Sequence, residues 1–407
     1  MSVAIETTDR RIVDDATAKR NARILSVGQA LGGSGSVVII STGGIIGHML
    51  AADKSLATLP VSCYILGTAL ATLPANLLMR RTGRRAGYMI GAGSGAVAAL
   101  IAAAGIFYGN FWLFSLGALL MGIYWAFIQS YRFAAADTAS DLFKAKAISW
   151  VLVGGVAAAI IGPQTVIWTK DLVQPFLFLG TFLAVAGLAL VGVALMSRID
   201  IPKPPPPMAG DGGRPLSAIV AQRRFIVAAG CGAVSYAIMS LVMTATPVAM
   251  VGCGLSTESA ALGIQWHVMA MFVPSFFTGN LIARFGKEKV VAAGLMILAL
   301  AATVALMGLS VWNFWAALVL LGLGWNFGFI GATAMLTDCH LAAERNKVQG
   351  MNDFLVFGLN AAASFSSGVL LNVAGWNAVN FIVFPAIVLC LAALVWLAGT
   401  RKRPVSA

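Results

Sequence analysis

Long, uninterrupted apolar segments are the feature that most limits what this chain can fold into. Twelve of them occur, each about as long as the 20 or so residues that a helix needs to cross a lipid bilayer. They lie at about 22–49, 55–79, 86–108, 111–136, 147–169, 175–197, 222–250, 257–283, 289–309, 312–337, 347–374 and 377–399. Only 10% of the residues are charged, against about a quarter in a soluble domain. The sequence therefore predicts an all-α membrane protein with twelve transmembrane helices.

A stretch rich in proline and glycine divides these segments six and six. It reads RIDIPKPPPPMAGDGGRPLSA (198–218), and it cannot continue a helix because proline lacks a backbone N–H. Such a composition is typical of a linker. We therefore expect an N-terminal six-helix bundle at 22–197, a cytoplasmic linker at 198–219 and a C-terminal six-helix bundle at 220–399. Short cytoplasmic tails at 1–21 and 400–407 would flank the two bundles.

The positions of the basic residues predict the orientation in the membrane. Lysine and arginine favour the cytoplasmic side of membrane proteins. With the N-terminus inside, all 27 Lys and Arg residues except Lys54 and Lys170 fall on that side. Both termini are therefore predicted to be cytoplasmic. The net charge of +12 does not indicate a nucleic-acid partner, because the charges lie in short clusters between apolar segments that face membrane lipid.

The two halves of the chain repeat each other. The tripeptide NFW occurs at Asn110–Trp112 and again at Asn313–Trp315, and the stretch NLLMRRTGRR (76–85) aligns with GNLIARFGKE (279–288) at the same shift. Two halves related in this way, with a site between them, form a transporter architecture. No nucleotide-binding loop or catalytic triad is visible, so we predict neither enzyme activity nor a permanently bound cofactor.

The basic turns after the second and eighth segments resemble a signature of the major facilitator superfamily, which usually reads Gly-x-Leu-Ala-Asp-Arg-x-Gly-Arg. The positions that match are Leu78, Arg81, Gly83 and Arg84 in the first copy and Gly279, Leu281, Arg284, Gly286 and Lys287 in the second. The acid of the signature is missing, because Arg80 and Ala283 stand in its place. The resemblance implies the twelve-helix fold in two bundles, with Arg81, Arg84 and Arg284 as gating candidates.

Two pairs of potential metal ligands lie near the middle of the seventh and eighth segments. Met239 and Met243 are four residues apart, as are His267 and Met271. Residues four apart share one helix face, and neighbouring helices pack about 8–10 Å apart, so the four side chains can converge. Three thioethers and one imidazole form a soft, uncharged ligand set that suits Cu(I). On spacing alone, methionine packing and a proton relay or substrate hydrogen bond at His267 stay open as alternatives.

The same residues carry a closer resemblance. Met-x-x-x-Met followed by His-x-x-x-Met, together with SYRFAAADTASD, QWHVMAMFVPSFFTG and NDFLVFG, is similar to the CcoA-type copper importers of proteobacteria. This resemblance implies that Met239, Met243, His267 and Met271 bind Cu(I) as transported substrate in the bacterial inner membrane. It also implies copper supply for the assembly of a cbb3-type haem–copper oxidase, and a cytoplasmic copper chaperone as partner. A related branch takes up riboflavin on much of the same scaffold.

Other side chains are candidates for a copper path or for gating. The path candidates are Cys231, Met250, Cys253, Cys339 and His340. Packing and ordinary loop positions are the alternative for all of them. Arg132 and Asp137, near the inner end of the fourth segment, are candidates for a cytoplasmic gate or ion pair. Asp353 is the one acid well inside a segment, and it is a candidate for proton coupling.

Copper import is thus the expected function, and two alternatives stay open. An importer of riboflavin or another small organic solute would line a larger cavity with aromatic residues such as Trp125, Trp325 and Phe327. Such an importer would also tolerate replacement of the methionines by leucine. A membrane sensor or assembly partner would bind an ion without carrying it across.

Overall fold

The computed structural model describes residues 15–137, 139–201, 213–341 and 344–401, and within them the chain is helical, with no β-strand. The N-terminal half consists of α1 (Asp15–Leu50), the 3-10 helix η1 (Lys54–Leu56), α2 (Leu59–Thr82), α3 (Arg84–Phe107), α4 (Phe111–Ile128), α5 (Tyr131–Asp137), α6 (Asp141–Thr169) and α7 (Leu179–Met196). The C-terminal half consists of α8 (Leu216–Val220), α9 (Arg223–Gly252), α10 (Thr257–Phe272), α11 (Ser275–Phe285), α12 (Lys287–Leu306), α13 (Val311–Leu336), the 3-10 helix η2 (Thr337–Cys339), α14 (Arg345–Phe381) and α15 (Val383–Arg401). Much of the predicted tails and linker, at 1–14, 202–212 and 402–407, lies outside the described residues.

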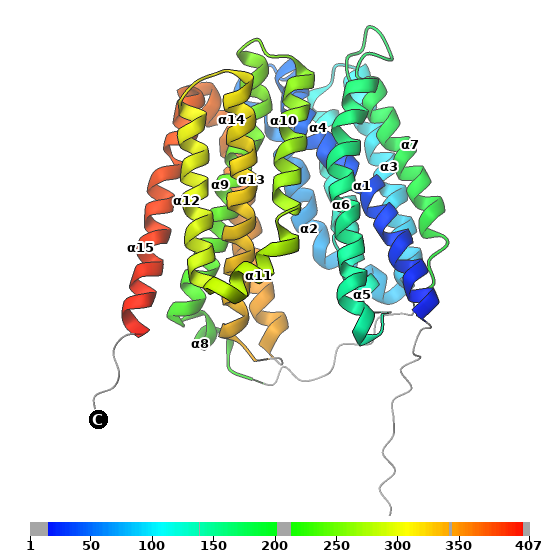
Figure 1. The fold of residues 1–407 in the computed structure, drawn as a ribbon. Helices are drawn as coiled ribbons and strands as arrows, with labels where there is room; N and C mark the ends of the chain where they lie inside the picture. Colours follow the sequence, from blue (N-terminus) through cyan, green and yellow to red (C-terminus); the bar gives the residue numbers. More distant parts are fainter. Residues whose placement is uncertain (1–14, 138, 202–212, 342–343, 402–407) are drawn as a thin grey trace, which may run out of the picture.

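The number of membrane crossings follows from these helices. Among the described residues, ten helical stretches are long and apolar enough to cross a membrane, and the bent pair α10–α11 adds an eleventh. One of the ten, Lys347–Gly399, contains two crossings, because the chain turns at Gly375, whose φ of 78° favours glycine. α14 and α15 then run in opposite directions (Figure 1). The prediction of twelve membrane helices is confirmed.

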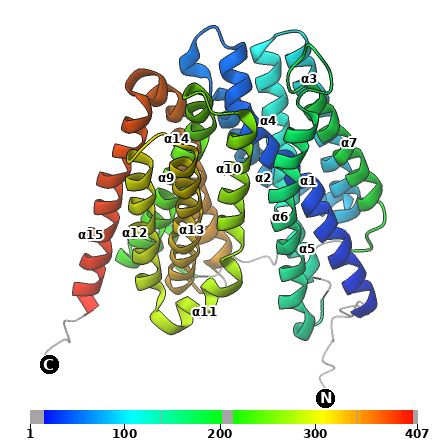
Figure 2. The same cartoon turned by 45° about the horizontal axis from the view of Figure 1, so that its top comes forward.

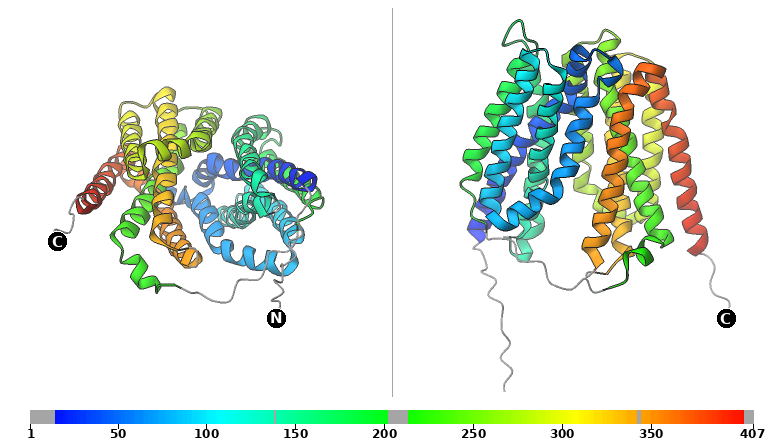
Figure 3. Two further views of the ribbon diagram at one scale, coloured as in Figure 1. Left: turned by 60° about the horizontal axis from the view of Figure 1, so that its bottom comes forward. Right: turned by 180° about the vertical axis from the view of Figure 1, so that it is seen from behind.

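The helices form two bundles that stand side by side (Figure 3). One holds α1 to α7 and the other α9 to α15. The beginning of α1, the end of α7, α8 and the end of α15 all lie on the same face of the molecule (Figure 1). This arrangement agrees with the two cytoplasmic termini that the basic residues predict.

Glycine allows two helices of the N-terminal half to touch through their backbones. A Cβ atom on Gly67 would lie 2.0 Å from the carbonyl oxygen of Leu119, and one on Gly122 would lie 2.0 Å from that of Tyr64. Any larger residue would push α2 and α4 apart. Such close approach is a common way for helices to associate in a membrane, where lipid tails are as apolar as the side chains.

The structure differs from the sequence-based prediction in two spans, which are broken where continuous helices were expected. The fourth span divides into α4 and α5, and the eighth bends by 43° between α10 and α11. Pro274 lies at this bend and has no N–H to donate, so the helical hydrogen bonds cannot continue across it.

Asn326 of α13 satisfies polar groups at the bend between α10 and α11. Its fully buried amide donates to the carbonyl oxygen of Met271 and to the hydroxyl of Ser275, each at 2.7 Å. Its side-chain oxygen accepts a hydrogen bond from Thr278 at 2.6 Å. Because lipid supplies no hydrogen bonds, a broken helix persists in the membrane only where neighbouring helices supply them.

Polar contacts between the two halves gather toward the outer face. Lys170, in the loop after α6, pairs with Glu258 at the start of α10 at 2.9 Å. Deeper in the membrane, Gln164 of α6 donates to Gln265 of α10 at 3.4 Å. α6 and α10 thus face each other across the line between the bundles (Figure 2). At the cytoplasmic end, the main contacts of α5 and α11 are within their own halves. The structure is therefore closed toward the outside and parted toward the cytoplasm.

Candidate functional site

The four residues predicted to bind copper all lie inside the C-terminal bundle. Met239 and Met243 of α9 and His267 and Met271 of α10 are each less than a tenth exposed, so none of them faces lipid. The three methionines belong to one continuous core that runs through both halves. Within the described part of the chain, no three His, Cys, Asp or Glu side chains lie close enough to hold a metal ion.

His267 faces α13. Its Nδ1–H donates to the carbonyl oxygen of Leu318 at 2.8 Å, which leaves Nε2 buried and without a partner among the described residues. A Cβ on Gly322 of α13 would lie 2.5 Å from the carbonyl oxygen of His267, so the two helices are in backbone contact here. One ring nitrogen of His267 therefore joins α10 to α13, a structural role that the sequence analysis did not consider for this residue.

The side chains proposed for a copper path lie at separate places and make local contacts. Cys231 is buried and points its thiol at the carbonyl oxygen of Cys390, 3.9 Å away. Met250 is fully buried in α9, whereas Cys253 is exposed just beyond that helix. The thiol of Cys339 contacts the carbonyl oxygen of Met335, one turn earlier in its own helical segment.

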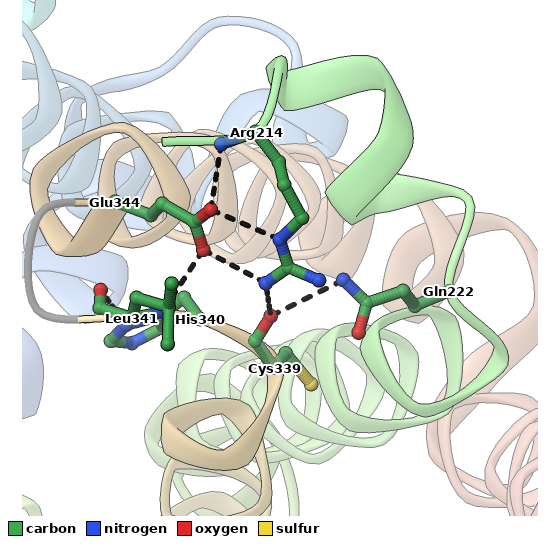
Figure 4. Close-up of polar contacts among 6 residues, drawn as sticks. All are labelled: Arg214, Gln222, Cys339, His340, Leu341 and Glu344. Atoms are coloured by element: carbon green, nitrogen blue, oxygen red, sulfur yellow. Dashed lines mark hydrogen bonds and ion pairs between the residues drawn. The ribbon is translucent and has the colours of Figure 1, made fainter. Parts of the chain in front are cut away.

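Cys339 and His340 instead lie beside a group of hydrogen bonds that ties Arg214, in the linker, to Glu344 (Figure 4). Arg214 donates through its backbone N–H and its guanidinium to the carboxylate of Glu344, at 2.8 to 3.0 Å, and through Nη2 to the carbonyl oxygen of Cys339. The Glu344 side chain is completely buried. These hydrogen bonds, together with one from the backbone of Leu341, hold the pKa of Glu344 well below its usual value.

The gating candidates divide into those that form ion pairs and those that do not. Asp137 of α5 pairs with Arg84 at the start of α3, not with Arg132. Arg132 lies over the ring of Phe133, 4.8 Å from its centroid. Arg81 is exposed at the end of α2. Arg284 and Asp353 are also exposed, and Arg284 lies 5.2 Å from the centroid of the Phe285 ring.

A second ion-pair network at the cytoplasmic end was missed by the sequence analysis. Arg224 at the start of α9 bonds both Glu288 of α12 and Asp338 of η2, at 2.9 and 2.6 Å, and Lys287 also bonds Asp338 at 2.6 Å. All four residues belong to the C-terminal half, so the network ties the cytoplasmic ends of its helices together. The available signals were a basic residue shortly after the linker, an acid in the second basic turn (Glu288) and an acid just after the tenth segment (Asp338).

An aromatic cluster in the C-terminal half was also missed, apart from Trp325. It consists of Tyr236, Trp325, Phe329 and Phe357, from α9, α13 and α14. Trp125 contacts the cores of both halves, and Phe327 packs against Phe277. No single segment of sequence signals this cluster, because its members come from three helices.

An apolar groove of about 470 Å³ lies between α9 and α14. Its lining residues are Ala229, Gly230, Ala233, Phe354, Leu355, Gly358, Leu359 and Ala362. None of these side chains can form a hydrogen bond, so the groove lacks the polar groups that fix the orientation of a polar solute.

The chain is similar to known membrane transporters in both sequence and fold. A family model of the Major Facilitator Superfamily matches residues 25–275 and 228–407. The riboflavin transporter RfnT of Brucella anthropi is 54% identical over 386 residues, which cover 94% of this chain and 97% of the relative. The uncharacterized MFS-type transporter YdeG of Bacillus subtilis is 30% identical over 94% of this chain and 92% of its own length. A crystal structure of a mutant of the nucleoside transporter NupG has the same fold, with a TM-score of 0.73, 14% identity and coverage of 93% and 99%.

The expectation of copper import is wrong in the light of these relatives. A chain 54% identical over almost its whole length is a riboflavin transporter, which favours the organic-solute alternative. Copper as cargo, a copper chaperone as partner and a role in oxidase assembly are withdrawn with it. The physical reason for the error is that Met-x-x-x-Met and His-x-x-x-Met are equally compatible with packing and with one hydrogen bond between helices, as at His267.

Proposed function

Because this chain belongs to the Major Facilitator Superfamily, we propose that it imports riboflavin across the bacterial inner membrane. The observation that carries the proposal is the 54% identity to a riboflavin transporter over 94% of the chain. Identity of this extent includes the membrane helices that would surround the cargo. It therefore supports a shared cargo far more strongly than a short motif does.

The arrangement of the two halves supports a carrier that delivers its cargo to the cytoplasm. Contacts between α6 and α10 close the outer face, while the cytoplasmic ends α5 and α11 contact their own halves. In an alternating-access cycle, the state that is closed outside and parted inside is the one from which an importer releases its cargo.

Uptake of radiolabelled riboflavin tests the proposal. Cells that can neither make nor import riboflavin would express the chain or an empty vector, with the protein level in the membrane measured in parallel. We expect time-dependent uptake and growth at low external riboflavin only in the cells that carry the protein. Riboflavin uptake equal to that of the empty vector, at a normal protein level, would refute the proposal.

A methionine variant provides the matched control. Met239→Leu combined with Met243→Leu conserves volume, and such swaps usually cost less than about 1.5 kcal/mol of stability. We expect near-normal riboflavin uptake in this double variant, because neither sulfur is needed as a ligand. Radiolabelled copper uptake should stay at the level of the empty vector in both proteins. Copper uptake that depends on the two methionines would contradict the proposal.

A further inference from the structure

Four aromatic side chains of the C-terminal half meet in the aromatic cluster defined above. The Tyr236 ring lies at its centre, steeply inclined to the other three rings, with centroid distances of 5.4 Å to Trp325, 5.1 Å to Phe329 and 5.9 Å to Phe357. Trp325 and Phe329 are stacked, with centroids 5.3 Å apart and 16° between the ring planes. Aromatic rings in such arrangements attract one another through their quadrupoles, so the four rings hold one another in fixed positions.

The aromatic cluster faces the other half of the protein. Tyr236, Phe329 and Phe357 are only partly buried. Trp325 lies behind them with 7% of its surface exposed. Tyr236 also interacts electrostatically with Arg132 of α5, which belongs to the N-terminal half. Tyr236 therefore lies at the boundary between the two bundles, with Phe329 and Phe357 packed against it.

Two exposed charges lie near the aromatic cluster. Arg132 and Asp353 come from opposite halves and interact electrostatically, but they form no ion pair within the described part of the chain. Charged side chains in membrane helices face a bundle interior or a water-filled cavity rather than lipid. Asp353 and Phe357 are four residues apart on α14, so Phe357 lies on the same side of that helix as this charge.

Polar groups beside the cluster have unused hydrogen-bonding capacity. Among the described residues, neither the indole N–H of Trp325 nor the side-chain oxygen of Asn360 has a partner, although both atoms are buried. Asn360 follows Phe357 by three residues on α14, and Ser364, one turn further, contacts the Ser62 hydroxyl of the N-terminal half at 3.0 Å. Buried polar groups without partners are uncommon in proteins, and they often mark a place where a ligand or water binds.

We propose that the aromatic cluster stacks the planar heteroaromatic ring of an uncharged polar cargo, while Arg132 and Asp353 bind its polar atoms from opposite halves. The inference rests on the proposed function, since riboflavin combines such a ring with a chain of hydroxyl groups. One cation and one anion balance each other around an uncharged cargo.

A binding assay with riboflavin and the purified full-length protein in nanodiscs tests the subsite. Binding is measured from the quenching of riboflavin fluorescence. Stacking of a base on one aromatic side chain typically changes affinity by about 5- to 150-fold. We expect Tyr236→Leu and Phe357→Leu each to raise the Kd by about tenfold or more and to weaken the quenching. Tyr236→Phe keeps the ring and should restore tight binding.

Phe327→Leu is the matched control, because Phe327 is two residues from Phe329 on the same helix and packs against Phe277 instead of the cluster. Its Kd should equal that of the wild type. An unchanged Kd in both Tyr236→Leu and Phe357→Leu, with riboflavin uptake by the wild type intact, would overturn the subsite and leave the proposed function standing. Absence of uptake by the wild type would instead overturn the function. If Tyr236→Leu does not fold, Phe357→Leu decides the question.

Discussion

Replacing Asn326 by leucine should destabilise the protein through the bend between α10 and α11. The variant loses the two hydrogen bonds that the asparagine donates to Met271 and Ser275 and the one that it accepts from Thr278, all within 2.7 Å. Side-chain hydrogen bonds between membrane helices average about 0.6 kcal/mol each, so the three together stabilise the fold by about 2 kcal/mol. The Met271 carbonyl would also be left buried without this donor, which raises the expected cost to about 4 kcal/mol.

Thermal unfolding in detergent measures this loss of stability. For domains of 150–250 residues, each kcal/mol of lost stability lowers Tm by about 2–4 °C. We therefore expect Tm to fall by about 8 °C or more. Asn380→Leu is the matched control. Asn380 is equally buried, but its amide makes a single described hydrogen bond, to the Trp376 carbonyl of its own helix. Its Tm should fall by less than half as much. Equal losses in the two variants, or a wild-type Tm for Asn326→Leu, would refute the role assigned to Asn326 at the bend.

Three further perturbations have defined outcomes. Glu344→Gln should lower Tm equally at pH 8 and pH 5.5, because the Glu344 carboxyl is ionised in both the folded and the unfolded protein at these pH values. The difference from the wild type should shrink as the pH falls below 4.5 toward the lowered pKa of the folded protein. Gly122→Ala should cost about 1–3 kcal/mol of stability, measured as a fall in Tm, because its Cβ would lie 2.0 Å from a backbone oxygen of α2. Gly93→Ala is the control and should keep the wild-type Tm, because no atom lies within 4 Å of the added Cβ. Gln164→Cys with Gln265→Cys, bridged by a bifunctional methanethiosulfonate reagent, should lose riboflavin uptake until the bridge is reduced, since the bridge would hold the outer face closed.

Each of these expectations has a contrary result. A Glu344→Gln difference that stays constant as the pH falls below 4.5 would show that the carboxyl titrates near its usual pKa. Equal Tm values for the two alanine variants would show that α2 and α4 are not in backbone contact. Normal uptake by a fully cross-linked protein would show that the outer face need not open.

Much of the fold was predictable because it follows from local properties of the chain. Segment length and apolar content determine which stretches cross the bilayer, and the positions of basic residues determine the direction. The bend at Pro274 is the instructive exception. The proline is visible in the sequence, but the partner that makes a bend tolerable there is Asn326, more than fifty residues away. Hydropathy alone therefore predicted one continuous helix at 257–283.

The site was far less predictable, because it depends on which helix faces meet. Spacing correctly placed Met239 and Met243 inside the bundle, but it could not show that His267 bonds the carbonyl of Leu318 on α13. The aromatic cluster around Tyr236 joins residues that are up to 121 positions apart, from 236 to 357. The nature of the cargo was the least accessible property, because one scaffold accommodates chemically unrelated solutes.

The anchoring of Arg214 connects the start of the C-terminal half to α14. Arg214 stands just before α8, and its guanidinium binds Glu344 and the carbonyl oxygen of Cys339. Glu344 directly precedes α14. A displacement of Arg214 would therefore act on the helix that carries Asp353 and Phe357.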